Sequence, residues 1–201
     1  MKIKKGEKTK RKLFESAEAL FEKYDFDKVS VDAIVESAGV AKGTFYIYFE
    51  SKDALILSFL SEYVHDIDAD YKAHLDSLPT ETTASDMLLS LLGKIADVLT
   101  DTIGYNKMRI IYKLQLTETL DMDTVKGYNR ELYKIFTHVL ERGMELKEFN
   151  TEIPLDVLTK HFVMAIRGIS YEWCIRYPNF DLKEEVLTHF QLLLSGILTA
   201  K

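Results

Sequence analysis

The residues with the clearest chemistry stand in one short stretch, 39–49, and the chemistry they suit is contact with DNA. Lys42 can meet a backbone phosphate or the edge of a guanine. Gly43 has no side chain, so the backbone can approach a sugar-phosphate chain closely. Thr44 can donate its hydroxyl to a phosphate oxygen and can touch a thymine methyl with its own methyl group. One stretch therefore holds groups for both the backbone and the bases of a duplex.

The aromatic side chains of this stretch divide into two pairs. Phe45 and Phe49 are four residues apart, so they fall on one side of a helix and are expected to be buried as its anchor. Tyr46 and Tyr48 are long, rigid and able to form hydrogen bonds, and we expect them to point outward toward DNA. Lys52 follows shortly afterwards and is expected to clamp a backbone phosphate.

Three short helices must hold these groups in place. The first is expected over 8–24, where apolar residues recur with helical spacing. Ser30 is suited to cap the second helix, and Gly39 to end it in the left-handed conformation. A third helix follows within a few residues. This helix–tight turn–helix spacing is typical of a helix-turn-helix unit.

The remainder of the chain also favours helices, which predicts an all-α fold of about nine helices. Only nine Gly and three Pro occur in 201 residues, and strong helix formers dominate. Ser51 is expected to cap a long fourth helix that Pro79 ends. Five further helices are predicted near 84–102, 105–117, 121–146, 154–177 and 182–199. We expect a small N-terminal domain over 1–51, a connecting helix over 52–78 and a larger C-terminal domain over 79–201.

The stretch AGVAKGTFYIYFESKDAL, residues 38–55, closely resembles the tetracycline-repressor (TetR) family of bacterial transcriptional regulators. The family pattern is similar to A-G-V-S-K-G-T-L-Y-x-H-F-x-S-K-E-x-L. Three positions depart from it: Ala41 replaces the frequent Ser, Tyr48 stands where His is common, and Ile47 fills a variable position. Two roles are consistent with the sequence for the Ile47 side chain: contact with a thymine methyl, or partial burial.

By position, the resemblance implies that one set of residues contacts DNA. These are Ser30, Val31, Val40, Ala41, Lys42, Gly43, Thr44, Tyr46, Tyr48 and Lys52. A single short helix reads only a few bases, so the resemblance also implies a homodimer on a palindromic operator, with its half-sites about 34–36 Å apart. The predicted dimer interface on the last two helices is Phe162, Ile166, Ile169, Val186, Phe190, Leu193, Leu194 and Ile197.

The resemblance further implies a small-molecule effector, largely apolar or aromatic, inside the C-terminal domain. The predicted pocket residues are Tyr63, Met108, Arg109, Tyr112, Tyr133, Phe136, Arg167 and Trp173. The sequence is compatible with two kinds of charged effector, an anion or a cation. Inward-facing Arg109, Lys113 or Arg167 would suit an anion, whereas inward-facing Glu118 or Glu172 would suit a cation.

The net charge of −6 conceals an uneven distribution. Seven of the first twelve residues are Lys or Arg and one is acidic, whereas the rest of the chain carries 19 basic and 31 acidic residues. The basic end can attract phosphate, although a solubilising tail would have the same composition. A cytoplasmic location is expected, because the chain shows neither a signal peptide nor a membrane-spanning segment.

Catalytic and metal chemistry are not expected, and no cofactor is predicted. The single cysteine, Cys174, rules out an intrachain disulfide and a zinc finger. The five His residues lack the spacing of metal-binding motifs, and no nucleophile or phosphate-binding motif occurs. Asp66, Asp68 and Asp70 resemble the start of a calcium loop, but the required later Gly and Glu are missing. We therefore expect these three carboxylates to form a solvated helix face.

Taken with the resemblance, these features predict a ligand-responsive transcriptional regulator that binds DNA as a dimer and is released by a small molecule. A repressor is the expected form. The alternative is a helical ligand-binding or protein-interaction module whose N-terminal head no longer reads DNA. An all-helical enzyme is the third possibility, and no set of residues supports it.

Overall fold

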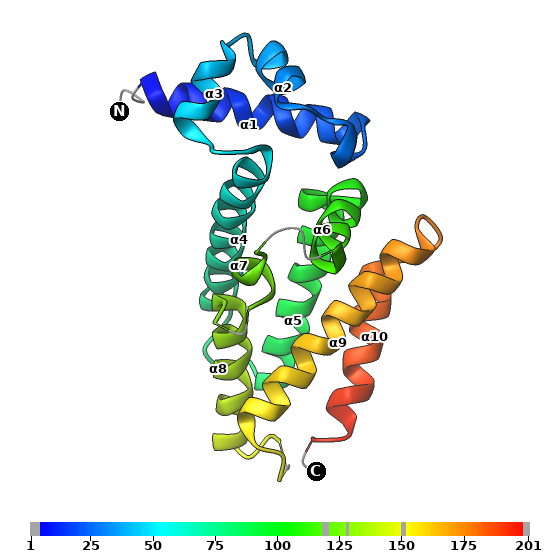
Figure 1. The fold of residues 1–201 in the computed structure, drawn as a ribbon. Helices are drawn as coiled ribbons and strands as arrows, with labels where there is room; N and C mark the ends of the chain where they lie inside the picture. Colours follow the sequence, from blue (N-terminus) through cyan, green and yellow to red (C-terminus); the bar gives the residue numbers. More distant parts are fainter. Residues whose placement is uncertain (1–4, 118–120, 128, 150–151, 199–201) are drawn as a thin grey trace. The chain divides into compact units, whose positions relative to one another are not determined.

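The computed structural model describes residues 5–117, 121–127, 129–149 and 152–198, and within these ranges the regular elements are helices (Figure 1). The expected all-α class is confirmed. All nine expected regions are helical, and the region near 121–146 contains two helices, the single turn α7 and α8. Their bounds are α1 Lys5–Lys23, α2 Val31–Ala38, α3 Lys42–Tyr48, α4 Lys52–Asp76, α5 Ala84–Asp97, α6 Tyr105–Thr117, α7 Asp123–Lys126, α8 Glu131–Glu145, α9 Leu155–Arg176 and α10 Leu182–Ser195.

The chain divides into two units with separate interiors. The first contains 1–63 and 110–125, and the second contains 64–109 and 126–201. The first unit thus extends beyond the expected boundary at residue 51 and takes in part of α6. Helices α4 and α6 are each continuous, and each contributes residues to both units.

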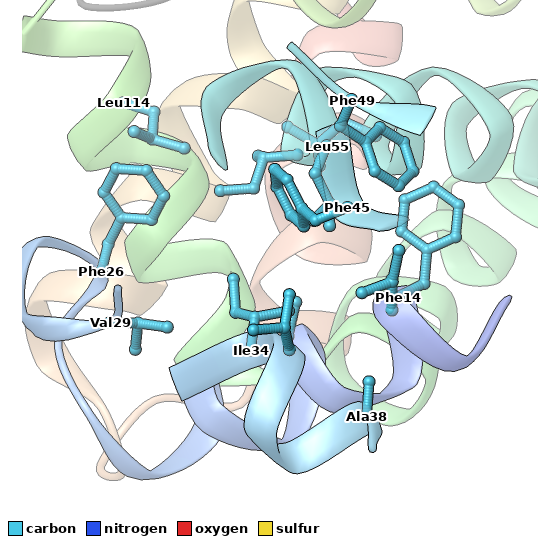
Figure 2. Close-up of a cluster of buried hydrophobic side chains, with 14 of the residues drawn as sticks. Phe14, Phe26, Val29, Ile34, Ala38, Phe45, Phe49, Leu55 and Leu114 are labelled. Carbon is cyan, nitrogen blue, oxygen red and sulfur yellow. The ribbon is translucent and has the colours of Figure 1, made fainter. Parts of the chain in front are cut away.

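The interior of the first unit is built from α1, α2 and α3, with α4 and α6 completing it (Figure 2). Phe45 of α3 is fully buried, and its ring centroid lies 5.7 Å from that of Phe49. Phe14 of α1 packs against Phe49 at 5.3 Å. Leu114, from α6, is 2% exposed and belongs to the same cluster. The predicted burial of Phe45 and Phe49 is therefore confirmed.

The interior of the second unit is formed by α5, α8, α9 and α10. Helix α5 packs on both α8 and α10, and α8 packs on α9. The fully buried side chains Leu88 and Leu92 of α5 belong to this interior, as do Phe136 of α8 and Phe190 of α10. The apolar stripes that predicted these helices are thus the faces that they bury.

One expectation about α4 is wrong. Asp68 is only 3% exposed, whereas it was expected on a solvated face with Asp66 and Asp70. Its carboxylate accepts hydrogen bonds from the Arg130 guanidinium, the shortest at 2.7 Å. Asp66 and Asp70 are exposed, and Asp70 pairs with Lys94 at 2.8 Å. The ion pair with Arg130 provides the compensation that a buried carboxylate requires.

The single helix expected near 121–146 is also wrong, since α7 and α8 are separate. Helix α8 begins at Glu131, and its Leu132 N–H donates to Asp68 Oδ2 at 3.3 Å. The carboxylate that satisfies this helix end comes from α4, 64 residues away in the chain. Local sequence therefore gives no sign of this helix start.

The junction between α5 and α6 has an unexpected form. Residues Val98–Ile103 form a π-helical segment, which ends at Gly104 with φ 78°. Gly104 thus occupies a backbone conformation that favours glycine. Within the described ranges, none of the helices has the length and hydrophobicity that crossing a bilayer requires.

Candidate nucleic-acid interface

The turn between α2 and α3 has the geometry that its sequence predicts. The Ser30 hydroxyl caps α2 by accepting a hydrogen bond from Ala33 N–H at 3.1 Å. Gly39 ends α2 in the left-handed region, with φ 63° and ψ 38°. The Val40 N–H then donates to the Val35 carbonyl at 3.0 Å, which closes the helix end. Helix α3 begins at Lys42, two residues later.

Helix α3 has one buried side and one open side. At 100° per residue, positions 42, 46, 43 and 47 follow one another around an arc of about 140°. Lys42, Gly43, Tyr46 and Ile47 fill these positions, and all four are exposed. Phe45 lies on the opposite side and is fully buried. We call these four exposed residues the outward face of α3.

Gly43 stands in the middle of the outward face. A Cβ added there would meet nothing within 4 Å, and its φ lies outside the left-handed range. Neither packing nor backbone conformation therefore requires glycine at this position. Glycine within a helix lowers stability by about 0.5–1 kcal/mol relative to alanine. A close approach by a partner molecule is the remaining physical reason for it.

Lys42 is held at the start of α3 by a carboxylate of α2. Its ammonium lies 2.7 Å from Asp32 Oδ1, and both side chains are more than half exposed. The hydrogen bond to Asp32 raises the pKa of Lys42 above its ordinary value. Lys42 is therefore charged at neutral pH, and a phosphate that binds it must compete with Asp32.

The other predicted contacts of the helix-turn-helix differ in exposure. Ser30 and Ala41 are exposed, whereas Val31, Val40 and Thr44 are half-buried. Val31 and Val40 also pack against the core of the first unit.

The structure places Tyr48 differently from Tyr46. Tyr46 is 51% exposed on the outward face. Tyr48 is half-buried and packs against the core cluster, and its hydroxyl would lie 3.3 Å from a Cβ added to Gly6. The expectation that both tyrosines point outward therefore holds for Tyr46, while Tyr48 packs against the core of the first unit.

Lys52 is bonded within the protein. Its Nζ donates to the carbonyl of Phe26 at 2.8 Å and to that of Val29 at 2.9 Å. The ammonium also lies 4.0 Å from the centroid of the Phe26 ring. Burial lowers the pKa of Lys52 from its ordinary value. This environment favours a role for Lys52 in holding the loop before α2 over a direct phosphate clamp.

Helix α6 supplies contacts to the N-terminal segment that contains α1, α2 and α3, which we call the head, and the sequence did not predict these contacts. The Lys113 ammonium forms a hydrogen-bonded ion pair with Asp27, 86 residues earlier in the chain. This hydrogen bond lowers the pKa of Asp27. Leu114 and Met122 are buried in the same unit. Lys113 thus binds a carboxylate of the head, which argues against a role for it in binding an anionic effector.

Lys2 and Lys4 of the basic N-terminal end lie outside the described residues.

The predicted effector residues fall into separate groups. Tyr63 and Tyr112 belong to the first unit, and the other six belong to the second. In the second unit, the Arg167 guanidinium lies 5.4 Å from the centroid of the Tyr133 ring. Trp173 is buried and packs edge-on against Tyr105.

Arg109 also lies beside Tyr105, with its guanidinium 6.0 Å from the ring centroid. Met108 and Phe136 are buried, at 7% and 0% exposure. Of the acidic alternatives, Glu172 pairs with Arg176, while Glu118 lies outside the described residues.

A pocket of about 330 Å³ lies in the second unit between α4, α5 and α8. Its walls include the apolar side chains of Leu75, Met87 and Ile135. Lys134 and Glu131 also line it and pair with each other at 2.9 Å. The predicted effector residues are not among those that line this pocket.

The predicted dimer residues require a correction. Six of the eight are at most 9% exposed and are therefore occupied within one chain: Phe162, Ile166, Val186, Phe190, Leu194 and Ile197. Ile169 is half-buried, and Leu193 is 37% exposed. The strongest apolar stripe of each helix faces the interior of its own chain, because that face removes the largest apolar area from water.

A second, weaker apolar stripe of these helices is exposed. On α9, Val157, Met164 and Tyr171 recur every seven residues and are 39%, 50% and 43% exposed. Ile175 continues this stripe at 60%, and Leu192 of α10 is 68% exposed. We call these five residues the exposed stripe of α9 and α10.

The cap at Ser30, the left-handed Gly39 and the outward face of α3 together define a helix-turn-helix DNA-binding protein. The family model for bacterial regulatory proteins of the tetR family matches residues 13–59, which include the whole helix-turn-helix. The chain belongs to this family, whose members are transcription regulators and not enzymes.

Individual relatives extend the similarity beyond the head. The uncharacterized HTH-type transcriptional regulator YvdT of Bacillus subtilis is 31% identical over 140 residues, which cover 68% of this chain and 72% of that protein. The fatty acid metabolism regulator protein of Bacillus subtilis is 27% identical over 184 residues, covering 86% of this chain and 87% of that protein. The crystal structure of FadR from Bacillus subtilis with stearoyl-CoA has the same fold, with a TM-score of 0.74 at 20% identity, covering 93% of this chain and 98% of that one.

Proposed function

We propose that this regulator is a homodimeric, ligand-responsive repressor that binds a palindromic operator through α3 and is released by a small molecule. The outward face of α3 is the observation that carries this proposal. It combines a charged Lys42 and an exposed Tyr46 with a glycine that the protein's own packing does not require. These groups suit phosphate and base contacts in a major groove.

The exposed stripe of α9 and α10 supports dimerisation. Its residues are apolar and lie on adjacent packed helices. An exposed apolar patch on a protein that must bind two half-sites is best covered by a second copy of the same surface. Two copies then present two α3 helices to an operator, which provides the affinity that one short helix lacks.

The proposed effector has an apolar chain and an anionic group, as in an acyl thioester of coenzyme A. The name of the fatty acid metabolism regulator, 27% identical over most of the chain, supports this class. Buried Met108, Phe136 and Trp173 supply apolar surface in the second unit, while Arg167 and Arg109 supply positive charge. These residues are the ones proposed to bind the effector, and alanine variants of each would test them.

Helices α4 and α6 provide a route from the effector to DNA. Both helices are continuous between the second unit and the head, and α6 holds Asp27 through Lys113. An effector that favours a different orientation of these helices would change the distance between the two α3 helices, so that they would no longer match the two half-sites of the operator. A hundredfold preference for the DNA-incompetent state corresponds to about 2.7 kcal/mol.

The test is a gel-shift titration of the DNA upstream of the protein's own gene at several salt concentrations. We expect retardation at low salt that weakens steeply as salt rises, because phosphate contacts release counterions. Lys42→Ala and Tyr46→Ala should each reduce binding. No retardation at the lowest salt would contradict the proposal, and unchanged binding by both variants would show that the head is only a scaffold.

The effector class is tested separately by thermal unfolding. Acyl-CoA of increasing chain length should raise the melting temperature, because a ligand of the native state stabilises it. Coenzyme A alone is the matched control for the anionic group. Equal shifts with coenzyme A and with long-chain acyl-CoA would exclude the acyl chain as the recognised part.

A further inference from the structure

Ile47 has the largest exposed fraction among the large apolar side chains of the described residues. It is 77% exposed, although it lies within helix α3, directly after Tyr46. Phe45, two residues earlier, is fully buried. The sequence left Ile47 open between burial and DNA contact, and its exposure excludes burial in the free chain.

Ile47 stands four residues after Gly43 on the outward face of α3. Side chains of a helix lean toward its N-terminus, so residue 47 extends over the surface at residue 43. Gly43 has no side chain there and leaves open space around its Cα. The side of Ile47 that faces Gly43 is therefore uncovered and is available to a group that approaches the helix at this glycine.

Neither residue stabilises the free protein. Glycine is a poor helix former, β-branched isoleucine has a slightly lowered helix propensity, and α3 has only seven residues. An exposed isoleucine also removes little apolar area from water. The pairing of Gly43 with Ile47 is thus better explained by the surface that α3 binds than by folding.

We propose that Ile47 is a specificity-determining residue that contacts the C5-methyl group of a thymine in each operator half-site. This proposal rests on the proposed function. The thymine methyl is the apolar group that the major groove displays, and aliphatic side chains are its usual partners. Lys42 and Tyr46, on the same face, have polar groups suited to phosphate and base edges, so Ile47 supplies the apolar contact.

The experiment begins with duplexes that the wild-type protein selects from a random DNA library. Each thymine of the selected site is then replaced by deoxyuridine, which lacks only the methyl group, and binding is measured by fluorescence anisotropy. We expect one position in each half-site to weaken binding about fourfold, the effect of losing one buried methyl. Replacement in both half-sites should weaken binding about sixteenfold if the two contributions add.

The protein variants identify which residue reads that methyl. Ile47→Ala should bind the thymine and deoxyuridine duplexes equally, whereas Ile47→Val should keep part of the difference. Leu116→Ala is the matched control, because Leu116 is an aliphatic residue at 70% exposure on α6, outside α3. This control should retain the full preference for thymine, and an unchanged melting temperature should show that each variant is folded.

Three results would overturn the inference. Deoxyuridine could leave affinity unchanged at every position, or Ile47→Ala could remain as sensitive to deoxyuridine as the wild type. In both cases the selected site would still demonstrate DNA binding, so the proposed function would survive. A library from which the wild type enriches no sequence would overturn the proposed function together with this inference.

Discussion

The carboxylate of Asp68 on α4 is bound by the Arg130 guanidinium through both of its oxygens. Arg130 Nε donates to Oδ2 at 2.9 Å and Nη2 donates to Oδ1 at 2.7 Å. The Leu132 N–H adds a third donor from the first turn of α8. The pair therefore joins α4 to the start of α8 within the second unit.

Removing the Asp68 charge should destabilise this unit strongly. Asp68→Asn leaves the Arg130 guanidinium, 15% exposed, without its main counter-ion. Breaking one side of a buried ion pair lowers the free energy of unfolding by about 3–5 kcal/mol. Urea unfolding measures the change, and Asp66→Asn on the exposed side of α4 is the control. Equal stability of both variants would show that the pair contributes nothing.

Two helix glycines should respond oppositely to alanine. Gly43→Ala should raise the free energy of unfolding by up to about 1 kcal/mol, because the added methyl meets no atom. Gly143→Ala should lower it by about 1–3 kcal/mol, since the added methyl would overlap the Phe149 ring. Thermal unfolding compares the two variants.

The same Gly43→Ala variant should bind DNA at least tenfold more weakly than the wild type. The added methyl occupies the middle of the outward face, where the backbone is expected to approach DNA. A gel shift measures this loss. A variant that is more stable and also binds DNA normally would remove the functional reason given for this glycine.

Asp32→Asn should strengthen DNA binding. Asp32 holds the Lys42 ammonium at 2.7 Å and competes with phosphate for it. Anisotropy titration at low salt should show a severalfold gain in affinity, which shrinks as salt rises. Glu36→Gln on the same helix is the control. It also removes one exposed negative charge, but the carboxylate that pairs with Lys42 is that of Asp32. Equal gains in both variants would indicate a general charge effect.

Met164→Glu should break the proposed dimer. It places a charge in the exposed stripe of α9 and α10, where a second copy would bury it. Light scattering should give the mass of a monomer, and operator affinity should fall because one head holds one half-site. Leu146→Glu is the control at a residue that is 57% exposed at the end of α8. A Met164→Glu protein that stays dimeric would place the interface elsewhere.

The head could be predicted because its determinants are local. Ser30 caps α2, Gly39 has φ 63°, and Phe45 is fully buried, each as the spacing of neighbouring residues predicts. Local rules of capping and helical period act over a few residues, so one sequence suffices to apply them.

The remaining features depend on residues that are distant in the chain. Asp68 meets Arg130 across 62 residues, and Lys113 meets Asp27 across 86. Lys52 looks like a surface lysine in sequence, yet it donates to carbonyls 23 and 26 residues earlier. The period of a helix specifies which residues share a face, but only packing decides whether that face meets the chain's own interior or a second copy.

The most direct measurement of the central claim is a nuclease footprint of the wild-type protein on the DNA upstream of its own gene. We predict two protected half-sites related by two-fold symmetry, with centres about 10–10.5 base pairs apart or a multiple of that spacing. Lys42→Ala combined with Tyr46→Ala should abolish both, and a bound acyl-CoA should release the wild type. A single unsymmetrical protected segment, or protection that persists in the double variant, would contradict the claim that two α3 helices bind this DNA.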